Sequence, residues 1–281
     1  MHWPPDLTIT MTTPMFCNAV PPCPYCIDIE CGIETIPWEP QKWLAGLLDL
    51  GDRYGQLHIL SPAAEPMSNS ELTGLLRLVA NEHYVSTSTN LIAPAELYEY
   101  HFAGVESINF CASFHPHLWR SIDEYLDKLD DVRSRGVKFS GTTVIGWPPL
   151  LDHIPEWQDA LQKDERTHGL INHIAPFNGV YNSIHYPTSY TPEDRKIICP
   201  QDDTSEHFRF KGENSLKGRR CNAGHSFMHI NPFGIASACY MNPGSNILGS
   251  LIDRDITTYE TARPCISDWC ACESMWEFVI E

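Results

Sequence analysis

The run Gln56-Leu-His-Ile-Leu60 is followed by Asn69-Ser-Glu-Leu-Thr-Gly-Leu-Leu-Arg-Leu-Val-Ala-Asn81. The first run is short and apolar, which is typical of a buried strand. The second places four apolar residues on one helical face, Leu72, Leu75, Leu76 and Val79. The two runs therefore predict a strand followed by a helix that packs on it. This βα unit is the pattern that the neighbouring sequence repeats.

The same alternation extends in both directions. It predicts further strands at 7–16, 84–88, 107–114, 137–145 and 170–175. It predicts further helices at 40–50, 94–101, 117–135 and 152–163, and a short one at 192–199. The inward side chains of the helix over 117–135 are Leu118, Ile122, Tyr125, Leu126 and Leu129. About six βα units indicate an α/β fold with a parallel sheet, open or curved into a partial (β/α)6 barrel of TIM type. We expect residues 1–200 to form it, with ligands at the carboxyl ends of the strands.

The tail beyond this region is rich in cysteine. Residues 201–218 are polar and predict a linker or surface loop. The runs 225–230 and 234–238 predict a β-hairpin that carries Cys221 and Cys239 at its outer ends. The later cysteines that could close the same site are Cys265, Cys270 and Cys272. We expect residues 201–281 to form a second, small domain.

Composition limits the class of protein. The chain has 281 residues, 42% of them apolar, which is enough to build a core without disulfides. Eleven cysteines is an odd count, and the start of the sequence has no signal-peptide pattern. No apolar run approaches the ~20 residues that cross a bilayer. A net charge of −17 argues against a nucleic acid partner. We therefore expect a cytoplasmic protein with no membrane partner.

Two groups of cysteines point to metal chemistry. Cys17, Cys23 and Cys26 follow the first predicted strand. Three thiolates can hold three corners of a [4Fe-4S] cube and leave the fourth iron open. In the tail, both zinc and an iron-sulfur cluster take four thiolates, so the spacing there is compatible with either.

These residues carry a resemblance. Cys17, Cys23 and Cys26, with Tyr25 directly before the last, resemble the cluster loop of the radical S-adenosylmethionine superfamily. The family usually has three residues between the first two cysteines and this chain has five, which leaves Cys31 as the alternative to Cys17.

Two other segments extend the likeness. The segment Ser61-Pro-Ala-Ala-Glu-Pro66 is similar to the Gly-Gly-Glu-Pro segment of the family, with alanine in place of both glycines. The spacing of Cys221, Gly234 and Cys239 is similar to the opening of the auxiliary-cluster domains called SPASM and, in the shorter form, Twitch. Because the tail has five cysteines, the shorter Twitch-like form with one cluster fits better.

The resemblance implies two [4Fe-4S] clusters and S-adenosylmethionine as cofactors. The first cluster would be held by Cys17, Cys23 and Cys26, and the auxiliary cluster by ligands from Cys221, Cys239, Cys265, Cys270 and Cys272. Glu65 would bind the amino group of the methionine part of the cosubstrate. In the family, an electron from the first cluster breaks a carbon-sulfur bond of S-adenosylmethionine. The 5′-deoxyadenosyl radical that forms then takes a hydrogen atom from the substrate.

Residues at the strand ends are further candidates. Ser88, Asn90, Ser113 and His115 could contact the cosubstrate, and Ile145 could form part of an apolar wall for its adenine. The alternatives are a turn at 88–90, a packing histidine at His115 and ordinary core at Ile145. Tyr25 is the aromatic residue of the cluster loop. The candidates for lining a substrate pocket are Phe177, Tyr181 and Tyr186.

Three functions are compatible with these patterns. The first is radical modification of a small natural-product intermediate such as a sugar or nucleoside, by oxidation, epimerisation, decarboxylation or sulfur insertion. The second is modification of a ribosomal peptide, and the sixteen residues before Cys17 leave no room for an amino-terminal leader-binding domain. The third is a zinc-stabilised binding protein without catalysis. The first requires an electron donor such as flavodoxin or ferredoxin.

Overall fold

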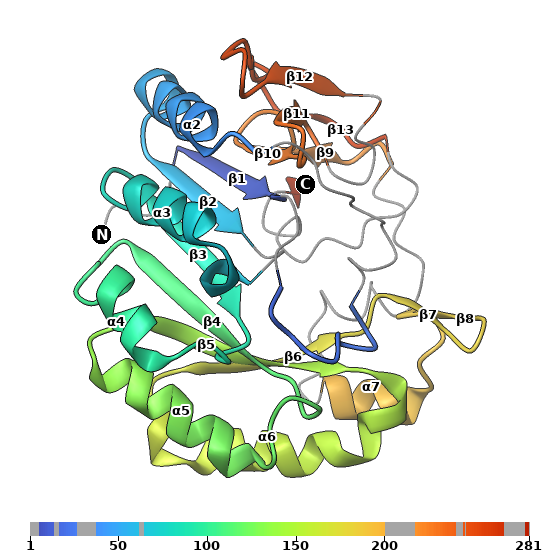
Figure 1. Ribbon diagram of the computed structural model, residues 1–281. Coiled ribbons are helices and arrows are strands. Elements are labelled where there is room, and N and C mark those ends of the chain that lie inside the picture. The colour runs from blue at the N-terminus through green and yellow to red at the C-terminus, as the bar shows by residue number, and fades with distance from the viewer. Residues whose placement is uncertain are drawn as a thin grey trace. The chain divides into compact units, whose positions relative to one another are not determined.

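The computed structural model describes residues 6–13, 17–26, 38–61, 65–199, 217–239, 244, 246–266 and 279–280 (Figure 1). The chain divides into two compact units that are interleaved in sequence. The first unit comprises Met1–Phe16, Ile33–Thr87 and Glu213–Glu281, and the second comprises Cys17–Gly32 and Ser88–Gly212. Each unit is described separately.

The first unit contains strands from both ends of the chain. Its strands are β1 (Leu7–Met11), β2 (Leu57–Ser61), β3 (Tyr84–Thr89), β10 (Phe227–Ile230), β11 (Ile235–Ser237) and β12 (Ile247–Ser250). Their order is β12-β11-β10-β1-β2-β3. β1 pairs in parallel with β2 and β10, and β2 pairs in parallel with β3. The β10–β11 and β11–β12 pairs are antiparallel. The last two residues of β3 belong to the second unit.

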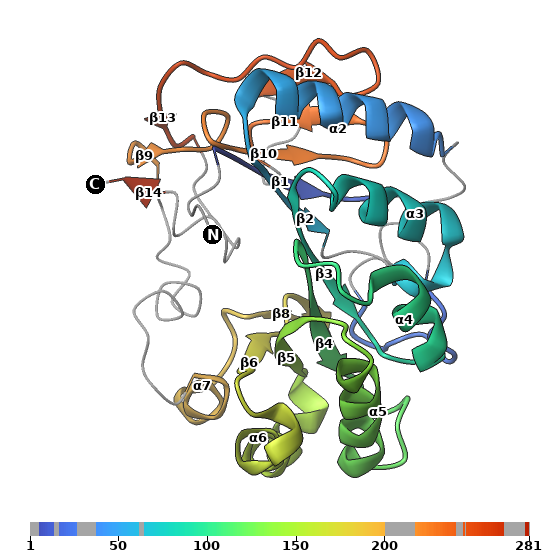
Figure 2. The ribbon, with the colours of Figure 1, turned by 90° about the vertical axis from the view of Figure 1, so that its left-hand side faces the viewer.

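Two helices cover one face of these parallel strands, α2 (Pro40–Tyr54) and α3 (Ser70–Val79) (Figures 1 and 2). The side chain of Asn69 accepts the backbone N–H groups of residues 71 and 72, which fixes the start of α3. All four apolar residues predicted to face inward from α3 are buried. A 3-10 turn, η1 (Pro66–Ser68), precedes α3.

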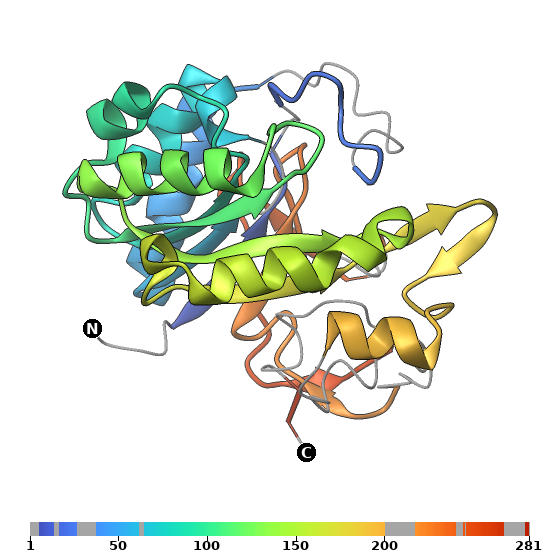
Figure 3. The same cartoon turned by 90° about the horizontal axis from the view of Figure 1, so that it is seen from below.

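The second unit continues the βα alternation. Its parallel strands are β4 (Ile108–Phe114), β5 (Phe139–Gly146) and β6 (Ile171–Pro176). Its helices are α4 (Ala95–Phe102), α5 (Ile122–Ser134), α6 (Ile154–Lys163) and α7 (Pro192–Ile198), with 3-10 turns η2 (Pro148–His153) and η3 (Glu165–Thr167). A hairpin of β7 (Gly179–Tyr181) and β8 (Ile184–Tyr186) extends from the end of β6 (Figure 3). The predicted α/β class with parallel pairing is confirmed.

The predicted start of the helix over 117–135 was wrong. The helix begins at Ile122 rather than at His117, because the Ser121 side chain accepts the N–H of Glu124 and caps it there. Tyr125, Leu126 and Leu129 are buried as predicted. Leu118, outside the helix, and Ile122, in its first turn, are only half-buried.

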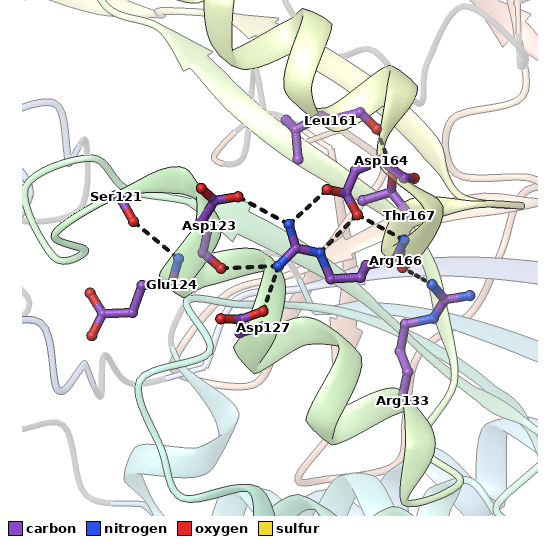
Figure 4. A network of polar contacts seen from close by, with 9 residues as sticks. All are labelled: Ser121, Asp123, Glu124, Asp127, Arg133, Leu161, Asp164, Arg166 and Thr167. Carbon is purple, nitrogen blue, oxygen red and sulfur yellow. Dashed lines mark hydrogen bonds and ion pairs between the residues drawn. The ribbon is translucent and has the colours of Figure 1, made fainter.

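One arginine ties η3 to α5 on the outside of the second unit (Figure 4). The Arg166 guanidinium donates to Asp164 at 2.7 and 2.8 Å and to Asp123 at 3.1 Å. It also pairs with Asp127 at 2.5 Å. Arg133, on α5, donates to the backbone carbonyl of Arg166. Three carboxylates and a carbonyl contact therefore fix the turn that leads into β6.

The predicted hairpin in the tail is present as β10 and β11. Its turn is stabilised by the Asn231 side chain, which accepts the N–H groups of Phe233 and Ile235. A second small sheet joins β9 (Arg220–Cys221) to β13 (Arg263–Pro264) and to β14 (Val279–Ile280). Residues 200–216, where we expect the domain boundary, lie outside the described residues, so the division at 200 stays a prediction. None of the described helices is long and apolar enough to cross a bilayer.

Candidate cluster and cofactor site

The loop that carries Cys17, Cys23 and Cys26 belongs to the second unit. Cys17 is exposed, and Cys23 and Cys26 are half-buried. A turn in which the Cys26 N–H donates to the Cys23 carbonyl at 3.0 Å brings two of them together. Burial, followed by the charges of Cys17 and Cys26, raises the pKa of Cys23 to about 12. The thiols are therefore close enough to oppose one another's ionisation, and a bound cation would reverse that effect.

The loop is fastened to the end of β4. The Tyr25 hydroxyl lies 2.8 Å from Nδ1 of His115, and the Cys23 sulfur lies 3.4 Å from the same nitrogen. The Tyr25 and His115 rings are stacked, with centroids 5.8 Å apart and planes inclined by 10°. Burial, with a smaller contribution from His117, lowers the pKa of His115 to about 4. The imidazole is therefore neutral at physiological pH and acts through hydrogen bonds.

Two more residues, one past β3 and one past β4, hold the loop. Asn90, just past β3, donates from Nδ2 to the Asn18 side chain at 2.8 Å. Its Oδ1 also accepts the N–H of Ile92 at 3.0 Å, so Asn90 is both a turn residue and a loop contact. His117 bonds to the backbone of Pro21.

Trp147, directly after β5, packs against two aromatic rings. Its ring lies 5.7 Å from that of Tyr25 and 5.6 Å from that of Tyr181. The indole Nε1 is buried, and no described residue accepts its hydrogen. Because a buried N–H usually has a partner, this donor is available to a ligand.

The other strand-end candidates share one face of the sheet. In β4 and β5, buried residues alternate with half-buried ones, and Ser113, His115 and Ile145 belong to the half-buried set. Ser88, in the last part of β3, follows the same alternation. Strand geometry therefore places these predicted residues opposite the helix-covered face.

Glu65 belongs to the first unit. Its side chain is 4% exposed, and its carboxylate accepts the N–H of Met67 at 3.2 Å, which caps η1. Glu65 is therefore a buried carboxylate four residues beyond the end of β2.

Three of the tail cysteines lie near one another in the first unit. Burial of Cys221, together with the charges of Cys265 and Cys239, raises its pKa. Cys221 pairs with Arg263 across β9 and β13, and the Cys265 N–H donates to the Arg219 carbonyl at 2.8 Å. Cys270 and Cys272, like Cys31 near the other end of the chain, lie outside the described residues. Among the residues that are described, no group of three or more histidine, cysteine or acidic side chains is placed so that it could hold a metal ion.

Sequence reasoning missed three contributors, Asn18, His117 and Trp147. Trp147 follows the end of β5 by one residue, so the rule that selected Ile145 could have found it. His117 lies in the turn at 116–118 that follows His115, so the rule on strand ends does not reach it. Asn18 has no signal of its own, because its partner is 72 residues away.

The site fits a thiolate-bound cluster. The loop supplies three neighbouring thiols, and soft thiolate ligands suit iron-sulfur clusters. Neutral imidazole, phenol and indole groups surround them. This is the donor set that the family resemblance requires.

Comparisons with known proteins place the fold. No known family and no curated protein matches the sequence. Among solved structures, SuiB of Streptococcus suis bound to the precursor peptide SuiA has 16% sequence identity and a TM-score of 0.62. The match covers 89% of this chain and 63% of SuiB, so the chain spans less than two thirds of that protein.

A second structure, anSMEcpe with bound S-adenosylmethionine, has 12% identity and a TM-score of 0.59. This match covers 97% of this chain and 82% of anSMEcpe. The chain therefore shares the fold of SuiB and anSMEcpe.

Proposed function

We propose that the chain is a radical S-adenosylmethionine enzyme in which Cys17, Cys23 and Cys26 hold a [4Fe-4S] cluster with one open iron. The observation that carries this proposal is the three-thiol loop fastened to the end of β4 through Tyr25 and His115. The shared fold supports it, because SuiB and anSMEcpe have both been solved with S-adenosylmethionine bound.

The residues of the chain would bind and orient the cosubstrate. The rings of Tyr25 and Trp147, with Ile145, offer an apolar surface for adenine, and the indole N–H of Trp147 offers a donor. The carboxylate of Glu65 would hold the methionine amino group. Ser88 and Ser113 supply hydroxyls on the same sheet face. When bound, the cluster and the cosubstrate supply one-electron reduction and hydrogen-atom abstraction.

The tail would hold one auxiliary [4Fe-4S] cluster. Cys221, Cys239 and Cys265 supply three neighbouring thiols, and Cys270 or Cys272 would complete the set. Exposed basic residues on and beside β9 and β13, Lys217, Arg219, Arg220 and Arg263, would offset the charge of four thiolates. The electron donor would be a small redox protein such as flavodoxin or ferredoxin, in the cytoplasm.

We favour a small-molecule substrate such as a sugar, a nucleoside or a related natural-product intermediate. Its support is the aromatic group beyond β5 and β6, where Phe177 contacts Tyr186 and Trp147 contacts Tyr181. Uncharged aromatic rings suit the apolar faces of small ring compounds. A peptide substrate is the second candidate, because SuiB was solved with its precursor peptide.

The first experiment tests the cluster. Protein purified without oxygen should contain about eight irons and matching acid-labile sulfide, since each cluster holds four of each. With S-adenosylmethionine and dithionite it should release 5′-deoxyadenosine, and a Cys23→Ala variant should not. Cys111→Ser is the matched control, because the Cys111 sulfur lies 3.0 Å from the Thr143 hydroxyl on β5 and a serine hydroxyl can replace it there, so the release should stay intact. Bound zinc without sulfide would contradict the proposal.

A second experiment separates the substrate classes. Cell extract of the source organism is divided into a fraction of small metabolites and a fraction of peptides, and each is added to the loaded enzyme. The small-metabolite fraction should increase the rate of 5′-deoxyadenosine release. Stimulation by the peptide fraction alone would reverse the ranking.

A further inference from the structure

We propose that His115 sets the reduction potential of the first cluster by hydrogen bonding to the Cys23 sulfur, and that the Tyr25 hydroxyl competes for the same ring nitrogen. This inference rests on the proposed cluster at Cys17, Cys23 and Cys26. It gives Tyr25 and His115 a role in positioning and tuning, and the family pattern does not provide that role.

The geometry provides a choice between two partners. One nitrogen, Nδ1 of His115, lies 2.8 Å from the Tyr25 hydroxyl and 3.4 Å from the Cys23 sulfur. A neutral imidazole with its hydrogen on Nδ1 has a single N–H to share between these two groups. While Cys23 is a protonated thiol it is a weak acceptor, so the phenol has the advantage. Bound to iron, the same sulfur is a thiolate, and hydrogen bonds to charged acceptors are about twice as strong.

The surroundings hold the ring in this position. Tyr25 is 8% exposed and stacks on the imidazole, and the edge of His117 lies against it with centroids 6.0 Å apart. The contacts described for His115 include no carboxylate. The ring therefore acts on the loop through its hydrogen bond rather than through an ion pair.

The hydrogen bond has a defined electrostatic effect. Reduction adds negative charge to the cluster and its sulfur ligands, so an N–H donor stabilises the reduced state more than the oxidised state. The potential is therefore higher with the His115 donor than without it. Each share of the N–H that Tyr25 takes reduces this effect, so the two residues act in opposite directions.

Three variants test this inference, with the potential of the first cluster measured by EPR-monitored redox titration. To isolate that cluster, all are made in a chain that also carries Cys221→Ala and Cys239→Ala. His115→Leu removes the donor and should lower the potential by about 59 mV. For a one-electron couple this shift is a tenfold change in the equilibrium constant. Tyr25→Phe removes the competitor and should raise the potential. His115→Asn should stay near the parent value, because its amide nitrogen stands as many bonds from Cβ as Nδ1 does.

A spectroscopic measurement gives a second readout. ENDOR of the reduced cluster should show an exchangeable proton coupled to the iron in the parent chain and in Tyr25→Phe, but not in His115→Leu. Circular dichroism confirms that each variant is folded. If His115→Leu does not fold, the rise in Tyr25→Phe together with the exchangeable proton still decides the question.

The outcomes separate the two proposals. Equal potentials in all variants, or shifts of the same sign in His115→Leu and Tyr25→Phe, overturn the tuning role while the cluster assignment stands. A parent chain that binds no iron and sulfide at the first site overturns both.

Discussion

Replacing Gly46 by alanine tests whether the late part of the chain packs on the early part within the first unit. Gly46 lies in the middle of α2, where alanine normally stabilises a helix by about 1 kcal/mol. Here a Cβ would stand 2.3 Å from the backbone oxygen of Leu251 and 2.6 Å from its Cγ. Ordinary contact begins at 3.4 Å, so the segment after β12 or the helix would have to move by about 1 Å.

The expected result is a loss of stability. Overpacking of a close contact costs about 3 kcal/mol at the upper end of its usual range, and a backbone oxygen cannot rotate away. After the helical gain is subtracted, Gly46→Ala should lower the free energy of unfolding by about 2 kcal/mol. At about 2 to 4 °C per kcal/mol for a large domain, the melting temperature should fall by about 4 to 8 °C.

Gly74→Ala is the matched control. Gly74 lies in the middle of α3, and a Cβ there would meet no atom within 4 Å. It should raise the free energy of unfolding by about 0.5 to 1 kcal/mol. Both variants are measured by urea unfolding and by thermal melting, followed by circular dichroism. If Gly46→Ala gains stability as Gly74→Ala does, Leu251 does not pack on α2 and the inclusion of the tail in the first unit is wrong.

Three more predictions concern single side chains. Arg166→Ala removes three partly exposed carboxylate contacts and should lower the free energy of unfolding by about 1 to 2 kcal/mol in urea melts. Its control, Lys163→Ala, removes one exposed ion pair and should lower the free energy of unfolding by less than about 0.5 kcal/mol. His83 is buried, no described residue bonds to either of its ring nitrogens, and burial lowers its pKa. The unfolded chain therefore takes up a proton below about pH 6.5 that the native chain does not, and stability falls as the pH drops. His83→Leu should lose less stability between pH 7 and pH 5 than the parent, and identical pH slopes would disprove this account. Glu65→Gln should keep the cap on η1 and change the free energy of unfolding by less than about 0.5 kcal/mol. It should weaken S-adenosylmethionine binding by roughly 10- to 100-fold, because a charged hydrogen bond is lost. Unchanged binding measured by calorimetry would remove Glu65 from the cofactor site.

Much of the fold follows from local sequence patterns. The helix over 70–79 was predictable because its apolar residues repeat at the helical period and Asn69 stands at the capping position. The start of α5 was missed because residues 117–120 continue an apolar rhythm that the stronger cap at Ser121 ends. The parallel pairing of β10 with β1 had no local signal, since the partners Thr8 and Phe227 are far apart in sequence.

The candidate site was predictable in type more than in contacts. Cysteine spacing indicated the loop, and the rule on strand ends indicated Asn90 and His115. One nitrogen of His115 contacts both Tyr25 and Cys23. This arrangement depends on the directions of side chains that are 90 residues apart in the sequence. Such directions are set by packing, which the pattern of residue types does not record.

The position of β1 between β2 and β10 has a consequence for synthesis of the chain. On the ribosome, β1 emerges well before its partner β10, which is complete only at residue 230. At about 5 to 20 residues per second, the strand waits roughly 10 to 45 seconds with one edge unpaired. An open edge with Leu7, Ile9 and Met11 beside it is prone to pair with other chains. Chaperone protection of the nascent segment that contains β1, and loss of soluble protein when the chain is cut before residue 227, are what this topology leads us to expect.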